Sequence, residues 1–279
     1  MFIKIGVREL APTTLIGVRL AIGALTLLPV ALVRVGARRV GRELRVFAWP
    51  LFFAALVNSA LPITALAWAE TRIDSGLGAV LQAAAPLFTA LLALRYSVGD
   101  RVGGARLVGL VVGFGGVALL VGVQPQGDLL AALAVVFSAF CYAIAALYTS
   151  RLDKISPLVS ALGMLTWSAV VLAPFAAVQA PSHVPSWGAI GSLLVLGVGG
   201  SGLAYVLYFS ILTGAGASYG ILVTYLTPAM ALFYGAVFLS EPVTASAVGG
   251  LVLILAGVAL GTGTFRPARR REERVASAP

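Results

Sequence analysis

The segment PTTLIGVRLAIGALTLLPVALV, residues 12–33, decides the fold, because a later segment of the chain repeats its pattern. Residues 157–178 read PLVSALGMLTWSAVVLAPFAAV, and both segments begin with a proline and carry a second proline near the end at the same spacing. Each is a continuous apolar run of about 20 residues, the length that crosses the hydrocarbon core of a membrane as one helix. The sequence therefore predicts a protein built from two similar sets of membrane helices.

A second pair of segments supports the repeat and indicates its orientation. GLVVGFGGVALLVG, residues 109–122, resembles GLVLILAGVALGTG, residues 250–263, and between these pairs Pro86 corresponds to Pro228. An odd number of apolar runs separates equivalent positions, so the two halves are expected to cross the membrane in opposite directions. Transporters that work by alternating access use this inverted-topology repeat.

The composition agrees with a membrane protein along the whole chain. Of 279 residues, 60% are hydrophobic and 10% are charged, whereas a soluble domain has roughly a quarter of its residues charged. The apolar runs are continuous rather than alternating with polar residues, which argues against a β-barrel. We therefore predict an all-α, polytopic transmembrane helix bundle with nine full spans. The expected spans are residues 12–35, 46–69, 75–96, 102–122, 129–149, 157–178, 187–212, 217–239 and 244–263.

The basic residues lie in alternate connectors between these spans. By the positive-inside rule these connectors face the cytoplasm, which predicts a multi-pass protein of the inner (plasma) membrane with a cytoplasmic C-terminus. This topology explains the net charge of +9 better than nucleic-acid binding, so we expect no nucleic-acid partner. The basic connector residues are Arg34, Arg38, Arg39, Arg42, Arg45, Arg95, Arg101, Arg106, Arg151 and Lys154, followed by five arginines in the tail.

The repeat also divides the chain into parts. Residues 1–124 form the first predicted repeat, residues 125–265 the second, and residues 266–279 a disordered basic cytoplasmic tail. In the repeat register Met1 pairs with Ala146, which lies near the end of its span, so the first helix is expected to be incomplete here. The prediction is an inverted arrangement of five plus five helices with the first helix truncated.

With the repeat in place, the sequence resembles the drug/metabolite transporter superfamily, in particular the EamA-type ten-helix exporters. The resemblance rests on Arg19 within residues 2–25, on AVLQAAAPLFTALLA with Pro86, and on residues 201–260 with Tyr205 and Pro228. It implies export of amino acids, their analogues and other small metabolites through a central cavity between the two repeats. The motifs are specific for the family and say little about the substrate.

Two prolines in the middle of equivalent spans are candidate hinge or gating residues. Pro86 and Pro228 each lack a backbone donor and so release the carbonyl group four residues earlier, at Gln82 and Thr224. Because lipid cannot satisfy a free polar group, we expect these turns to face a wet substrate path. The alternative is a structural kink satisfied by a neighbouring helix.

Arg19 is the candidate ligand for a substrate carboxylate, since a charge well inside a span is costly unless it meets a polar cavity or snorkels to the surface. Other polar and aromatic side chains deep in the spans suit an adaptable cavity, although any single one of them is more often explained by packing than by ligand binding. These further candidate substrate-binding residues are Asn58, Trp68, Gln82, Tyr142, Tyr205, Thr224 and Tyr225.

Catalytic and metal sites are not expected. The chain has one cysteine, Cys141, inside an apolar run, and no His or Cys spacing that suits a metal. Every Asp and Glu lies in a connector, a tail or at the end of a span, which favours facilitated diffusion over proton coupling. We therefore predict a secondary transporter that needs no cofactor and acts as a monomer or homodimer in contact with membrane lipid. A broad drug or cation exporter is the alternative, and an intramembrane enzyme is disfavoured.

Overall fold

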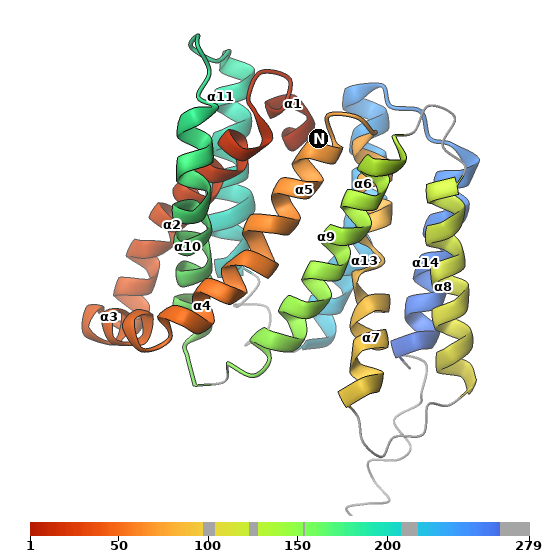
Figure 1. Ribbon diagram of the computed structural model, residues 1–279, viewed down its shortest axis with the longest axis horizontal. Coiled ribbons are helices and arrows are strands. Elements are labelled where there is room, and N and C mark those ends of the chain that lie inside the picture. The colour runs from red at the N-terminus through yellow and green to blue at the C-terminus, as the bar shows by residue number, and fades with distance from the viewer. Residues whose placement is uncertain (97–103, 123–127, 153, 208–216, 263–279) are drawn as a thin grey trace, which may run out of the picture.

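The computed structural model describes residues 1–96, 104–122, 128–152, 154–207 and 217–262. Throughout these ranges the regular structure is helical, and Figure 1 shows the long helices running side by side. This confirms the predicted all-α polytopic bundle. The helices are α1 (Phe2–Gly6), α2 (Pro12–Val35), α3 (Ala37–Val46), α4 (Ala48–Ala55), α5 (Leu61–Ala69), α6 (Ser75–Gln82), α7 (Ala85–Tyr96), α8 (Gly104–Gly122), α9 (Leu129–Thr149), α10 (Pro157–Val178), α11 (Trp187–Leu194), α13 (Ala217–Leu239) and α14 (Ala245–Thr262). Two π-helical segments, η1 (Leu56–Ala60) and η2 (Val195–Leu203), continue α4 into α5 and extend α11.

Six helical stretches in the described residues have the length and apolar composition to cross a membrane. They begin at Pro12, Ala48, Ser75, Leu129, Pro157 and Trp187, and three shorter apolar helices accompany them at Leu107–Val121, Leu226–Leu239 and Ala245–Leu260. Large apolar side chains cover the outside of the bundle: Leu25 is 69% exposed and Val33 is 86% exposed. Such a surface suits lipid rather than water.

Local signals in the sequence explain where several helices begin and end. Pro12 and Pro157 occupy the first turns of α2 and α10, where a missing N–H costs nothing. The carboxylate of Asp128 accepts the first free N–H groups of α9, and the hydroxyl of Ser186 caps α11 in the same way. Gly36 ends α2 with a φ of 90°, a conformation that side chains with a Cβ rarely adopt.

Glycines bring α8 and α14 together at one side of the bundle (Figure 1). A Cβ added at Gly257 would lie 2.4 Å from Cα of Gly113, and one added at Gly250 would lie 2.4 Å from the side chain of Leu120. Since the partner number falls along α14 as it rises along α8, the two helices are antiparallel. The small-residue stripes are therefore filled by contacts within the chain.

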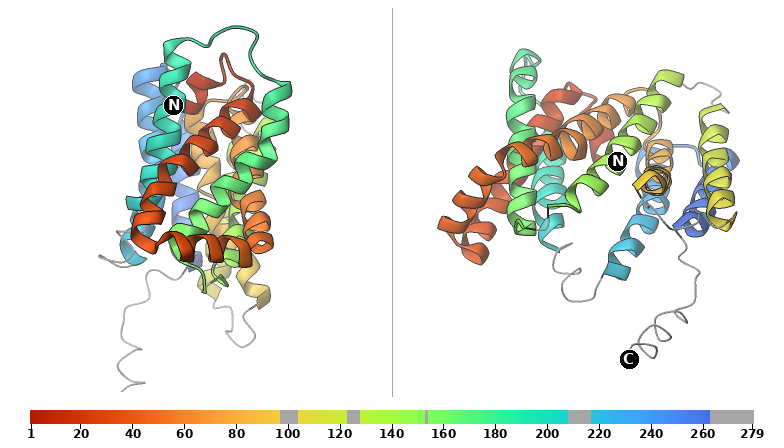
Figure 2. Two further views of the ribbon diagram at one scale, coloured as in Figure 1. Left: turned by 90° about the vertical axis from the view of Figure 1, so that its left-hand side faces the viewer. Right: turned by 60° about the horizontal axis from the view of Figure 1, so that its bottom comes forward.

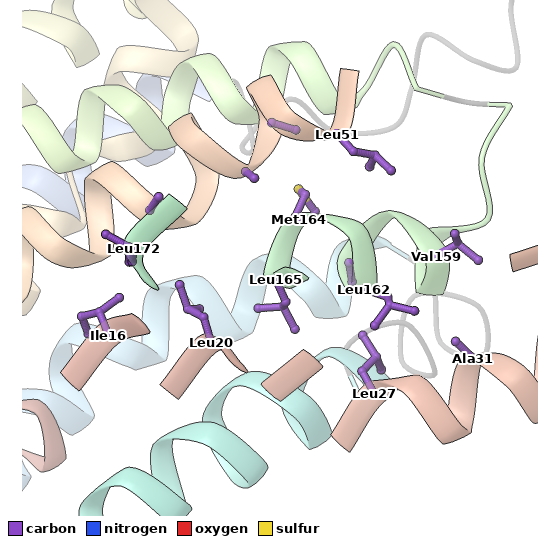
Figure 3. Packing of buried hydrophobic residues seen from close by; sticks show 14 of the residues in the cluster. Ile16, Leu20, Leu27, Ala31, Leu51, Val159, Leu162, Met164, Leu165 and Leu172 are labelled. Atoms are coloured by element: carbon purple, nitrogen blue, oxygen red, sulfur yellow. The ribbon is translucent and has the colours of Figure 1, made fainter. Parts of the chain in front are cut away.

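The opposite side of the bundle is packed around α2, α10 and α4. Figure 3 shows Leu20 and Leu27 of α2 reaching toward Leu165 and Leu162 of α10, with Leu51 of α4 near Met164. Leu20, Leu27 and Leu51 are all at most 1% exposed. A second cluster of buried residues joins α6, α7, α8, α9 and α14. The polar groups described below are therefore held by helices that pack firmly elsewhere along their length.

The main departure from the predicted architecture is α3. The stretch ARRVGRELRV was expected to be a connector because of its arginines, but it forms a helix with Val40 and Glu43 buried and its arginines exposed. Figure 2 shows this helix at one edge of the bundle, where α2 ends. Its few apolar positions recur with the period of a helix. The stretch is short, however, and the surrounding charged residues hid this pattern.

Candidate functional site

Arg19 lies on α2, inside the first long span, and is joined to a distant part of the chain. Its Nε donates a hydrogen bond of 3.0 Å to Oγ of Ser201, in η2. Ser201 is only 2% exposed, whereas Arg19 is partly exposed. Among the described residues, no carboxylate lies within ion-pair distance of the Arg19 guanidinium. The site thus holds a positive charge whose described direct partner is neutral.

Close backbone packing of α2 against η2 makes this contact possible. A Cβ added at Gly23 would lie 2.7 Å from Cβ of Ser201, and one added at Gly197 would lie 2.6 Å from Ile22. Gly200 also faces the guanidinium, with an added Cβ 3.8 Å from Nη2 of Arg19. Larger residues at Gly23 and Gly197 would separate the two elements and remove Ser201 from reach.

Asn58 and Tyr205 form a second polar contact. Nδ2 of Asn58 donates to the hydroxyl of Tyr205 at 3.4 Å, and to Oγ of Ser59 at the same distance. Tyr205 and Tyr142 both interact electrostatically with Arg19, and so does Glu70. Four of the predicted substrate-binding residues, Arg19, Asn58, Tyr142 and Tyr205, are therefore brought into one polar cluster from α2, η1, α9 and the end of the span that contains η2.

Both π-helical segments belong to this cluster. η1 carries Asn58 and η2 carries Ser201, and each interrupts the third helix of its predicted half when the incomplete first helix is counted. π-helical turns are rare and are found often at functional sites. The sequence analysis missed them, although each has a local signal: Pro62 lacks the N–H that an α-helix would offer to the carbonyl of Asn58, and residues 195–203 are rich in glycine.

Arg19 also lines a cavity of about 720 Å³. This volume is within the usual range for small-molecule sites. The cavity lies between α1, α2, η2 and α13, and most of its lining is apolar. The other lining residues are Met1, Phe2, Ile3, Leu196, Leu226, Thr227, Met230, Ala231, Tyr234 and Phe238. The geometry thus combines a cation, two phenols, an amide and an adjacent apolar space.

The two prolines have different effects on their helices. The helix is interrupted before Pro86, where α6 ends at Gln82 and α7 begins at Ala85. Pro228 is buried within α13, which continues without interruption from Ala217 to Leu239. The side chains of Thr224 and Tyr225, on the same helix, fall outside the described residues.

Gln82 is the last residue of α6, directly before the interruption, and its side chain lies in an unusual environment. Its Oε1 and Nε2 are buried and have no hydrogen-bond partner among the described residues, and the same holds for Oγ1 of Thr64. Leaving a buried polar group unsatisfied costs about 1–3 kcal/mol. This cost supports the prediction that Gln82 meets water or substrate.

Trp68 occupies a different setting from the Arg19 cluster. The guanidinium of Arg72 lies over its ring, 4.3 Å from the centroid, and Arg72 forms an ion pair with Asp128. The described contacts of Trp68 are thus with the connector that follows α5 and with the buried cluster that joins α6, α7, α8, α9 and α14. They favour an anchoring and packing role at the end of the span, and the predicted role of Trp68 in substrate binding stays a prediction.

Glu70 is a buried carboxyl group that the sequence analysis did not single out. It follows the last residue of α5 and is 5% exposed, and within the part of the chain that the structure describes its Oε2 has no hydrogen-bond partner. Burial raises the pKa of Glu70 to about 7; the N-terminal amine, Lys4 and Arg19 oppose this rise, and Glu241 adds to it. The expectation of facilitated diffusion rested on the lack of a carboxyl group deep within a span. Glu70 lies at the end of a span, as predicted, but it is buried there.

Comparisons with known proteins agree on a transporter. A profile of the EamA-like transporter family matches residues 1–122 and 129–262. An uncharacterized transporter of Bacillus subtilis (strain 168), YoaV, is 26% identical over 94% of this chain and 91% of its own length. An uncharacterized transporter of Archaeoglobus fulgidus is 28% identical over 92% of this chain and 90% of its own length. One solved crystal structure has a similar fold, with a TM-score of 0.64 at 21% identity over 94% of this chain and 90% of that chain.

Proposed function

We propose, from the premise that this chain belongs to the EamA-like transporter family, that it exports small metabolites bearing a carboxylate, in particular amino acids and related zwitterions. The observation that carries the proposal is the guanidinium of Arg19, which lines a cavity and has no carboxylate partner among the described residues. A charge inside a membrane protein is retained at a cost, and such residues mark substrate paths. A substrate carboxylate would supply the missing partner.

The rest of the cluster suits the other end of a zwitterion. The rings and hydroxyls of Tyr142 and Tyr205 offer partners for a substrate ammonium group, since cations bind to aromatic faces and hydroxyl oxygens accept hydrogen bonds. Asn58 already uses its amide to position the hydroxyl of Tyr205. The apolar lining contributed by α13 would then accept the remaining part of the substrate.

The mechanism that we propose is alternating access between two inverted halves. Three observations support it: the profile matches two separate ranges, equivalent spans both contain a π-helical segment, and the final helices of the two halves pack antiparallel through Gly113 and Gly257. In such transporters the two halves rock against each other around a site at their interface. The helix interruption before Pro86 would be one of the hinges.

The location that we propose is the inner membrane with a cytoplasmic C-terminus. The arginines of α3 and the basic residues of the connector before α10 lie at one end of the bundle, as the positive-inside rule requires for the cytoplasmic side. Acidic side chains such as Glu9, Glu70 and Asp128 lie in connectors at the other end.

A second candidate, export of organic cations, is favoured by one observation. Glu70 is a buried carboxyl group that interacts electrostatically with Arg19, and one of its oxygens has no hydrogen-bond partner in the described ranges; it would be a counter-ion for a positively charged substrate. Its raised pKa weakens this role, because the group is largely protonated below pH 7. The two candidates differ in which substrate charge is required.

Reconstituted liposomes separate the two candidates. Vesicles that contain the purified protein would be loaded with a panel of amino acids, or with the amines that result from removing their carboxyl groups, and efflux would be compared with protein-free vesicles. We expect efflux of amino acids and little efflux of the matched amines. Efflux of the amines alone would favour the cation exporter, and efflux of neither by folded protein would reject both.

A further inference from the structure

The end of the bundle that carries α3 holds a basic pocket outside the substrate site. Gly36, with its φ of 90°, ends α2 so that α3 turns away at the bundle edge (Figure 2). On α3, Arg38, Arg39, Arg42 and Arg45 are exposed. The helix thus presents four cations at the level where a span meets the membrane surface.

A buried carboxylate holds α3 in this position. Oε2 of Glu43 accepts the backbone N–H of Ser156 at 2.9 Å, at the start of α10, and Oε1 accepts Nε of Arg39 at 2.5 Å. Burial alone would raise the pKa of Glu43, but the bonds from Arg39 and Ser156 outweigh it and lower that pKa. Glu43 is therefore ionised, and one cation of α3 is already used to balance it.

The cations that remain converge on one pocket. Its volume is about 340 Å³, and it is lined by Arg39, Arg42, Glu43, Val46, Phe47 and Lys154. Three cations against one carboxylate leave an excess of two positive charges, contributed by Arg42 from α3 and Lys154 from the connector before α10. A phosphate group bearing one negative charge complements this excess.

The surroundings of the pocket indicate that the phosphate belongs to a lipid. Val46 lines the pocket and is 68% exposed, and Trp49 is 80% exposed in the first turn of the adjacent span. A free phosphate ion would gain nothing from these apolar side chains, whereas acyl chains would cover them. Tryptophan is also enriched at the level of the lipid headgroups.

We propose that this pocket binds the headgroup phosphate of an anionic membrane phospholipid, through Arg42 and Lys154, with its acyl chains against Val46 and Trp49. The bound lipid bridges α3, at the end of the first long span, and the connector that leads into α10. It therefore ties together two helices that the proposed mechanism assigns to different halves. The lipid site itself does not depend on the identity of the transported substrate.

The test is thermal unfolding of the purified full chain in detergent, with increasing concentrations of short-chain phosphatidylglycerol, phosphatidylcholine or inorganic phosphate. We expect phosphatidylglycerol to raise the unfolding temperature saturably and the other two to have little effect. The pair Arg42→Gln with Lys154→Gln should weaken the apparent affinity for phosphatidylglycerol about 25-fold, roughly fivefold for each cation. Arg38→Gln with Arg45→Gln is the matched control, since it removes the same charge from exposed positions outside the pocket, and it should leave the affinity within about twofold.

Each other outcome contradicts the proposal. Equal losses in both double variants would mean that general positive charge attracts the lipid, and stabilisation by inorganic phosphate alone would mean an anion site without a lipid. No saturable effect of phosphatidylglycerol on the wild-type protein would also overturn it. If the double variant fails to fold, Lys154→Gln alone provides the measurement, because this side chain is exposed and lies outside the helices.

Discussion

Arg19 and Ser201 are 182 positions apart in sequence, and Nε of the arginine donates to the hydroxyl oxygen of the serine at 3.0 Å. This bond links α2 to η2 and fixes the edge of the guanidinium that faces the protein. Because the guanidinium is planar, this bond also fixes the directions in which the remaining N–H groups of Arg19 point. The relationship turns a charge within a span into an oriented anion-binding group.

The variant Ser201→Ala should weaken substrate binding while leaving the charge of Arg19 in place. We expect the KM for a transported amino acid to rise about 5- to 10-fold, the equivalent of about 1 kcal/mol for the loss of one hydrogen bond that orients the arginine, with a smaller change in maximal rate. Ser192→Ala is the control, since Ser192 is equally buried in the same span but donates to the carbonyl of Ala189 in its own helix. Equal KM values for both variants would show that Ser201 does not orient the arginine.

Glu70 predicts a pH dependence of stability near neutrality. Its folded-state pKa of about 7 lies above the ordinary value of 4.5, so the folded protein binds a proton more tightly than the unfolded chain does. The contribution of Glu70 to the free energy of unfolding is fully present below about pH 4.5 and is lost as the pH rises to about 7. We therefore expect the unfolding temperature in detergent to fall between pH 5 and pH 7.

The variant Glu70→Gln should remove this fall, because the amide does not titrate. Glu9→Gln is the control: Glu9 is exposed and hydrogen bonds from Ser186 lower its pKa, so its titration lies below the window. A fall between pH 5 and pH 7 that persists in Glu70→Gln would assign it to another group.

Gln82 predicts a water-accessible position within the membrane. A cysteine at position 82, in a protein with Cys141→Ala, should react with a small water-soluble thiol reagent, and a transported substrate should slow the reaction. The reason is that the side-chain amide of Gln82 is buried without a hydrogen-bond partner among the residues that the structure describes. Leu81→Cys is the control, because Leu81 is 0% exposed in the core beside it and should stay unreactive. Inertness at position 82 in active protein would assign the helix interruption a structural role only.

The contact between α8 and α14 predicts a large difference between the effects of substituting two glycines of α14. At Gly257 an added Cβ would meet backbone atoms of Gly113 at 2.4 and 2.5 Å, so Gly257→Ala should destabilise the protein by about 1–3 kcal/mol. At Gly249, on the same helix, nothing lies within 4 Å of an added Cβ, and Gly249→Ala should be close to neutral. Unfolding temperatures in detergent measure both, and similar values would argue against the antiparallel pair.

The spans were predicted accurately from the sequence where a residue that favours the start of a helix precedes or opens the apolar run. Residues 129–149 and 157–178 were predicted with the bounds that the structure shows, because Asp128 and Pro157 mark their starts. α3 was not predicted because its arginines resemble those of a connector. Its packing against the bundle depends on the hydrogen bond from Ser156 to Glu43, residues that are far apart in sequence. The π-helical segments depend on a change of backbone partner that hydrophobic periodicity does not record.

The candidate site was predicted in part, for a physical reason. Unusual residues inside apolar runs, such as Arg19 and Asn58, can be recognised one at a time because each is costly in lipid. Their partners cannot be recognised in this way, since Ser201 is an ordinary small residue and becomes important only through close packing of α2 on η2. Glu70 was passed over because its position at the end of a span suggested solvent.

The central claim is that Arg19 binds the substrate carboxylate, and the most direct measurement is efflux from liposomes for one amino acid and its matched amine, compared between wild-type protein and Arg19→Gln. Arg34→Gln, at the exposed end of the same helix, is the control for loss of a positive charge. We predict that Arg19→Gln lowers amino-acid efflux about 10- to 100-fold, while Arg34→Gln leaves it near the wild-type rate. An Arg19→Gln variant that is folded and exports the amino acid at the wild-type rate would contradict the claim.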